Sequence, residues 1–163
     1  MEIELSLEAP WPCACDWAGL AGAAAEAAAR VAPELASPRL AASLLFTCDA
    51  EIRELNRQWR SRDKPTNVLS FPMLARGELL ALAPEGPPEM LGDIALAFET
   101  CAQEADDRRV PLEHHAAHLI VHGLLHLAGH DHETGPDAAD AMEQLEIKAL
   151  ALMGISNPYE GLE

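Results

Sequence analysis

Residues 111–132 of this chain read PLEHHAAHLIVHGLLHLAGHDH, and they include all seven histidines of the 163-residue sequence. Pro111 suits the first turn of a helix, because the backbone there needs no N–H donor. Gly129 suits the left-handed residue that ends a helix. The stretch therefore predicts a long helix from Pro111 to about Ala128, followed by a turn that carries the last histidines.

The histidine spacing in this helix predicts a metal site at its end. His118, His122 and His126 share one face, because each helical residue advances by about 100°. Two histidines four apart can hold one ion, whereas positions eight apart lie roughly 12 Å apart along the axis. Gly129 turns the chain back and can bring His132 under the pair. We predict that His122, His126 and His132 bind one Zn²⁺ and leave a fourth position for water.

Other residues of this stretch have roles that the sequence leaves open. His118 either contributes a hydrogen bond behind the metal ligands, contacts the substrate, or is a buried structural histidine. Asp131 either orients a ligand imidazole through its second nitrogen or stabilises the turn. His130 is not expected to be a ligand, and His114 is expected to be exposed.

Elements expected on either side of this helix define the fold. Alternating or continuous apolar runs predict strands at 3–7, 40–47, 67–71 and 93–98. Helical patterns cover 17–31, 49 to about 63, 99–109 and 137–154, and an irregular or hairpin excursion is expected at 74–90. This order predicts an α+β fold in one domain, residues 1–163. A single small mixed sheet of about four strands carries about five helices, with the metal site at the end of the long one.

Two of these helices have apolar stripes that predict core contacts. In the helix that Asp49 caps and Lys64-Pro65 stops, Trp59 belongs to the stripe and is expected in the core rather than stacked on a base. In the last helix the residues expected to face the core are Met142, Leu145, Ala149 and Leu152.

The charge of the chain is strongly acidic, yet its basic residues cluster. Eleven Lys and Arg against 27 Asp and Glu give a net charge of −16, so the average surface repels polyanions and membranes. Five of the eleven lie within residues 53–64: Arg53, Arg57, Arg60, Arg62 and Lys64. Arginine suits phosphate contact, although several of these side chains can instead form surface ion pairs.

The sequence also indicates a compartment. No apolar run reaches the roughly 18–20 residues of a membrane span, and the first residues lack the basic start of a secretory signal. The four cysteines are expected to be reduced thiols: Cys13, Cys15, Cys48 and Cys101. We expect a cytoplasmic protein.

Metalloproteases of the metzincin type share the spacing of His122, His126, Gly129 and His132, so peptide hydrolysis is an alternative function. Those enzymes place a glutamate directly after the first histidine as general base. Here that position is Gly123, and a protease would have to recruit another carboxylate, such as Glu133 or Glu143.

Three segments together resemble the YbeY family of bacterial rRNA maturation factors, which are metal-dependent, single-strand-specific endoribonucleases. The segments are NRQWRSRDKPTNVLSFP at 56–72, LGDI at 91–94 and HGLLHLAGHDH at 122–132. The resemblance implies an α+β fold, one zinc ion, and a role in maturing the 3′ end of 16S rRNA and in ribosome quality control. It further implies that Arg60 and His122 are important for cleavage, with single-stranded rRNA precursor and the small ribosomal subunit as partners.

A non-catalytic ribosome-assembly factor with a structural zinc is the competing class. Structural zinc usually has four protein ligands, so three histidines favour catalysis unless a cysteine completes the set. Cys13 and Cys15 are too close together for the usual metal-binding spacing. The role of Asp93, in the LGDI segment, stays open.

Overall fold

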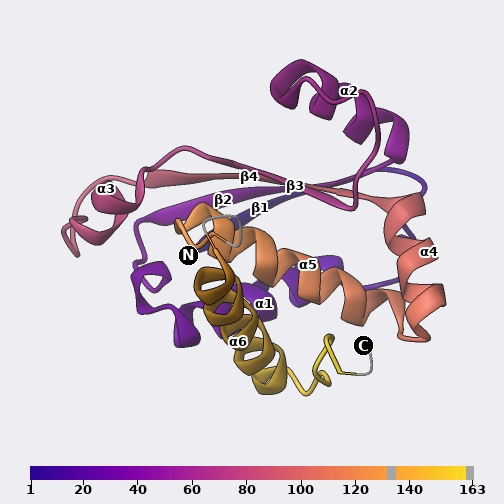
Figure 1. Cartoon of the computed structure of the whole chain (residues 1–163). Coiled ribbons are helices and arrows are strands. Elements are labelled where there is room, and N and C mark those ends of the chain that lie inside the picture. Colours follow the sequence, from indigo (N-terminus) through magenta and orange to yellow (C-terminus); the bar gives the residue numbers. More distant parts are fainter. Residues whose placement is uncertain (132–134, 161–163) are drawn as a thin grey trace.

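The computed structural model describes residues 1–131 and 135–160, and its elements follow the predicted order (Figure 1). The strands are β1 Glu2–Leu7, β2 Leu40–Thr47, β3 Val68–Pro72 and β4 Glu89–Ala97. The helices are α1 Trp17–Val31, α2 Asp49–Arg60, α3 Arg76–Leu80, α4 Phe98–Arg108, α5 Leu112–Leu127 and α6 Pro136–Leu152, with a 3-10 turn η1 at Pro33–Leu35.

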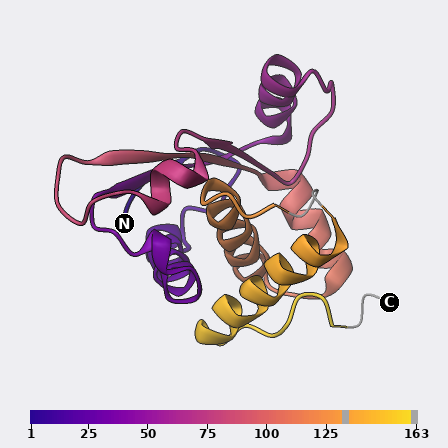
Figure 2. The same ribbon diagram turned by 60° about the vertical axis from the view of Figure 1, so that its left-hand side comes forward.

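The four strands form one mixed sheet in the order β1-β2-β4-β3. β1, β2 and β4 are parallel, whereas β3 pairs antiparallel with β4 and forms one edge. Figures 1 and 2 show α1, α5 and α6 on one face of the sheet and α2 on the other. The expected α+β fold with a small mixed sheet is confirmed. Within the described residues, no helix combines the length and apolar character needed to cross a bilayer.

Helix α5 lies at the centre of the helical layer. It contacts α1, α4 and α6 as well as β3 and β4, which explains why its sequence is apolar on most sides. Gly123 faces the sheet, and a Cβ added there would lie 2.9 Å from Ile94 Cδ1. The position where a metzincin carries its glutamate is therefore a close helix–sheet contact in this chain.

The turn after α5 is held from two directions. Gly129 has φ +95°, and the amides of Gly129 and His130 donate to the carbonyls of His126 and Leu125, the pattern of a glycine-terminated helix. Arg76 of α3 donates to the carbonyl of Ala128 at 2.7 Å. These hydrogen bonds fix the C-terminal end of α5, from which the chain continues to the predicted third ligand.

Glu34 also fixes this turn from η1. Its Oε1 lies 2.8 Å from His130 Nε2 and 3.4 Å from Arg76 Nη1. The His130 ring is thereby engaged with Glu34, consistent with the expectation that it is not a metal ligand.

Several expectations about helices were wrong in detail. The 74–90 excursion contains a helix, α3, which makes six α-helices in the described residues rather than about five. Helix α2 ends at Arg60, where Ser61 turns left-handed (φ 57°), and not at Lys64. Trp59 is 71% exposed and does not pack in the core. Leu152 is also exposed, and Leu150 is buried in its place.

A partly buried hydrogen bond between His115 and Glu104 joins α4 to α5 and should make stability pH-dependent. His115 Nε2 lies 2.8 Å from Glu104 Oε1, and this hydrogen bond lowers the pKa of Glu104. A lowered folded-state pKa gives stability above the ordinary glutamate pKa of about 4.3 that is lost as the pH falls. Glu104→Gln should therefore lower stability at pH 7 by about 1 kcal/mol, and the difference from wild type should shrink below pH 4.

Thermal unfolding between pH 3 and pH 8 measures this effect. Glu26→Gln, at an exposed position in the middle of α1, is the matched control and should follow the wild-type curve. A constant difference between Glu104→Gln and wild type at all pH values would contradict the assignment.

Candidate functional site

A polar cavity of about 480 Å³ lies along the β3 edge of the sheet. Arg60 and Arg62 line it from the end of α2, and His122 and His126 line it from α5. Backbone and side chains of 66–70, including β3, form the wall between them. Because α2 and α5 lie on opposite faces of the sheet (Figure 1), the helix that ends at Arg60 and the helix that carries the two histidines approach this cavity from opposite faces.

The two α5 histidines in the cavity stand one helical turn apart with their rings close together. The ring centroids of His122 and His126 are 4.7 Å apart, at an interplanar angle of 72°. Metal–nitrogen bonds are about 2.0–2.1 Å long, so two rings at this separation can turn their nitrogens toward one ion. His118 does not line this cavity.

Glu146 of α6 lies behind His122. Its carboxylate Oε1 is 2.9 Å from His122 Nδ1, and the side chain is almost fully buried. An ionised carboxylate can only accept, so the proton of this hydrogen bond is on His122 Nδ1, and in the neutral ring Nε2 is then the nitrogen that can bind a metal. This is the arrangement that orients metal-binding histidines in proteins.

Two further groups share the Glu146 carboxylate. His118 Nε2 lies 3.1 Å from Oε1, and the Tyr159 hydroxyl donates to Oε2 at 3.0 Å. Burial alone would raise the pKa of Glu146, but the hydrogen bonds from His118 and His122 outweigh it and lower the pKa to about 2. Burial also raises the pKa of Tyr159, which therefore stays a neutral donor. The carboxylate is thus a fixed negative charge next to the cavity.

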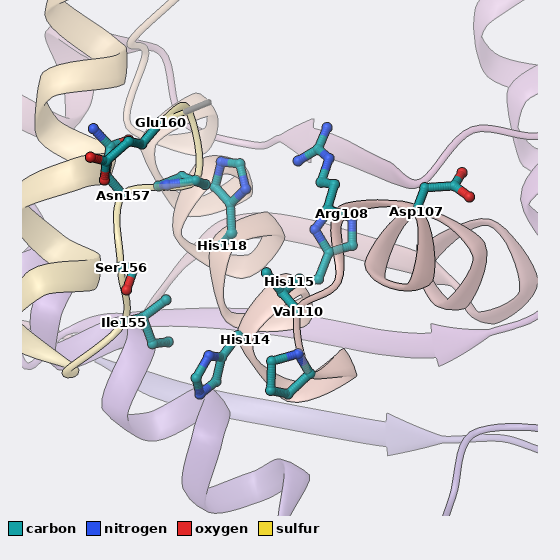
Figure 3. A pocket seen from close by; sticks show the side chains of 12 residues that line it. Asp107, Arg108, Val110, His114, His115, His118, Ile155, Ser156, Asn157 and Glu160 are labelled. Carbon is teal, nitrogen blue, oxygen red and sulfur yellow. The ribbon is translucent and has the colours of Figure 1, made fainter. Parts of the chain in front are cut away.

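His118 lines a different hollow, shown in Figure 3. This second cavity, also about 480 Å³, lies between the start of α5 and the segment after α6, with Arg108 and Asn157 on its walls. His118 is 6% exposed, and its Nδ1 has no hydrogen-bond partner among the described residues. Its Nε2 nevertheless supports Glu146, so of the roles left open the structure favours the hydrogen bond behind His122.

The basic cluster divides into paired and unpaired side chains. Arg53 forms an ion pair with Asp63 at 2.7 Å, and Arg57 pairs with Glu54. In the described part of the chain, Arg60 and Arg62 have no acidic partner, and both line the cavity. The site therefore holds two exposed guanidinium groups that can receive an anion.

The third predicted ligand, His132, lies outside the described residues. Within 1–131 and 135–160, no three His, Cys, Asp or Glu side chains gather closely enough to hold a metal ion. Asp131, which precedes His132, lines the cavity. The structure thus brings together Arg60, His122, His126 and Asp131, and the place of His132 stays a prediction.

The cysteines contribute no sulfur to this cavity among its described lining residues. All four are free thiols. Cys15 donates to Glu113 Oε1 at 3.1 Å near the start of α5, whereas Cys101 is buried. Asp93 lies on the other face of the sheet, in a groove beside α2.

Comparison with known proteins identifies the family. The model of the family described as endoribonuclease YbeY matches residues 18–154. The chain belongs to the endoribonuclease YbeY family. The match includes α2, β3 and α5, the elements that line the cavity, and it confirms the resemblance carried by the three sequence segments.

Curated YbeY relatives match nearly the whole chain. The endoribonuclease YbeY of Erythrobacter litoralis is 60% identical over 98% of both chains. That of Novosphingobium aromaticivorans is 57% identical over 96% of this chain and 95% of its own. A Thermotoga maritima protein solved in solution has a similar fold, with a TM-score of 0.60 over 92% of this chain and 87% of that one at 24% identity.

Glu146 and Tyr159 are the site residues that sequence reasoning missed in this YbeY chain. Glu146 lies between Met142 and Ala149 on the buried face of α6, where a charge needs a partner. A glutamate at a position that the helical repeat places in the core was the sequence signal that could have identified Glu146 as a site residue. Tyr159 follows α6 in an irregular segment and carried no signal of this kind.

Replacing Glu146 should weaken metal binding. Glu146→Gln removes the charge that holds His122 Nδ1–H, and losing such a partner typically costs 10–100-fold in metal affinity. We expect a zinc dissociation constant at least tenfold higher than that of wild type, measured by competition with a chromogenic chelator. Glu143→Gln, on the same helix, is the control and should bind as wild type does. Equal affinity in both variants would show that Glu146 does not orient His122.

Proposed function

We propose that this protein is a zinc-dependent endoribonuclease that cuts single-stranded RNA and acts in maturing the 3′ end of 16S rRNA and in ribosome quality control on the small subunit. The observation that carries the proposal is the shared cavity of Arg60, His122 and His126 at the β3 edge. Membership of the endoribonuclease YbeY family supports the RNA cleavage.

The donor set in the cavity fits a zinc ion. His122 presents Nε2 because Glu146 holds Nδ1, and the facing ring of His126 is 4.7 Å away. His122, His126 and His132 would hold the ion, and zinc bound by three imidazoles lowers the pKa of its water to about 7 and so supplies hydroxide. Cys13, Cys15, Cys48 and Cys101 do not line the cavity, which argues against a fourth, sulfur ligand.

Arg60 would bind the scissile phosphate from the opposite side of β3. A phosphodiester gains negative charge in the transition state, and a preorganised guanidinium stabilises that charge. Arg62 lines the same cavity and can contact a neighbouring phosphate. Binding by two or three cations within an acidic surface predicts a shallow dependence of RNA affinity on salt.

The metzincin-like alternative is disfavoured by packing. The residue after the first histidine, Gly123, contacts Ile94 and has no room for a glutamate. Glu143 is part of α6 and does not line the cavity. Glu133, the other carboxylate considered for this role, lies outside the described residues.

A side-by-side substrate assay tests the function. Wild-type protein of known zinc content is incubated with single-stranded RNA, the same RNA as a duplex, and casein. We expect cleavage of the single strand alone, abolished by a chelator and restored by zinc. Cleavage of casein, or of the duplex at an equal rate, would overturn the proposal.

A further inference from the structure

An apolar groove lies beside the cavity, on the face of the sheet that carries α2. It has a volume of about 610 Å³. Helix α2 lines it with Leu55 and Trp59, the sheet with Leu45 and Phe71, and the chain after β3 with Met73. Trp59 is 71% exposed and Met73 is 56% exposed. Exposed apolar side chains gathered in a groove mark a binding surface.

The groove and the cavity adjoin each other along β3 and the end of α2. Leu69 lines the cavity, and Phe71, two residues along the same strand, lines the groove. Strand residues two apart share a face. On α2, Trp59 lines the groove and the adjacent Arg60 lines the cavity. A ligand that Arg60 binds in the cavity therefore lies next to Trp59, a residue of α2 that lines the groove.

The charges around the groove determine from which side a polyanion can approach it. Arg60 at the end of α2, and Arg62 and Lys64 in the loop after it, are exposed, and no carboxylate among the described residues pairs with them. Asp93 lines the groove itself, and on the side away from α2 exposed Glu4 of β1 pairs with Ser43 of the groove wall. A phosphate backbone is attracted to the α2 rim and repelled from the β1 rim. Only an uncharged group attached to that backbone can enter the apolar groove.

We propose that Trp59 is a stacking platform for one base of the single-stranded RNA whose phosphate Arg60 holds. The proposal rests on the proposed function and adds a base-binding subsite to it. Stacking on an exposed aromatic ring accepts any base and requires an unpaired strand. This subsite gives a physical reason for single-strand selectivity, because a base inside a duplex cannot leave its stack without cost.

Tryptophan fluorescence can report this contact directly. Trp11 and Trp17 are 4% and 2% exposed, so Trp59 is the tryptophan that solvent quenchers and ligands reach. A 2′-O-methyl single-stranded oligonucleotide with an end label is titrated into the zinc-loaded protein. We expect quenching of tryptophan emission and protection from acrylamide that follow the binding curve from label anisotropy. Binding without any change in tryptophan emission would overturn the proposal.

Substitution gives the second measurement. Trp59→Ala should weaken oligonucleotide binding about tenfold, the order of one base–aromatic stack, and Trp59→Phe should retain part of the affinity. Leu152→Ala removes an exposed apolar side chain of α6, far along the chain from the groove, and should bind as wild type does. Unchanged affinity in Trp59→Ala would overturn the proposal and leave the groove to another partner, such as a protein.

The cleavage assay separates this inference from the proposed function. Wild-type cleavage of single strands together with unchanged binding by Trp59→Ala would remove the subsite and leave the nuclease. Weaker binding by Trp59→Ala in a protein that cuts no RNA would support the base-binding groove and remove the nuclease.

Discussion

Arg60→Ala will slow RNA cleavage by about 10²–10³-fold while the protein keeps its full zinc content. The guanidinium lies at the α2 side of the cavity, without an acidic partner among the described residues and across β3 from the histidines. Removing one preorganised group that stabilises transition-state charge costs a factor of this size. Single-turnover cleavage of a labelled single strand measures the rate, and elemental analysis measures the zinc.

Arg57→Ala is the matched control for this variant. Arg57 lies on the same helix, but its guanidinium is paired with Glu54. Its loss should leave the cleavage rate within about twofold of wild type, because an exposed ion pair contributes little. Loss of zinc from Arg60→Ala would instead mean that Arg60 supports the fold of the site.

His126→Ala should abolish both zinc binding and cleavage. Two imidazoles bind zinc much more weakly than three, and under the proposed function the loss of the metal would remove the activation of the attacking water. Purified variant should contain less than a tenth of the wild-type zinc, and added zinc should no longer raise its unfolding temperature as expected for a ligand of the native state.

His114→Ala provides the comparison for His126→Ala. His114 is exposed on the first turn of α5 and lines the second cavity, not the one that holds His122. It should retain zinc and activity. If His126→Ala kept its zinc at wild-type affinity, the predicted ligand set would be wrong.

Much of the fold could be predicted because its signals are local. The bounds of α1 and β2 agree with the predicted ranges, and the side chain of Asp16 accepts from the Gly19 amide as the start of α1 requires. Gly129 ends α5 as predicted, since a left-handed residue is needed there whatever packs around it.

The two wrong predictions of core contacts depended on how far the neighbouring part of the fold extends over each helix. Trp59 continues the apolar stripe of α2, but the sequence does not show that only Ile52 and Leu55 of this stripe reach the buried cluster around Leu69. Leu152 lies at the margin of the α6 face whose centre is Glu146 and Ala149. The helical repeat predicts the direction in which a side chain points. It does not predict how far the neighbouring element extends, and so whether that side chain is covered.

For the site, the helical repeat predicts that His122 and His126 stand together, whereas long-range contacts had to come from the structure. Glu146 is 24 residues from His122, and Tyr159 is 41 residues from His118. Neither contact follows from spacing within one helix. That Arg60 and the α5 histidines line one cavity could not be predicted either, because it depends on the position of the sheet between α2 and α5.

The edge position of β3 also suggests a route to inhibition. β3 bonds to β4 on one side, and its other side, along Val68 to Ser70, forms the cavity wall. The outer backbone groups of an edge strand can accept an additional strand from another chain. Under the proposed function, a short extended peptide paired with β3 would block RNA binding by main-chain hydrogen bonds alone, so a competitive inhibitor would not need to contact the metal site.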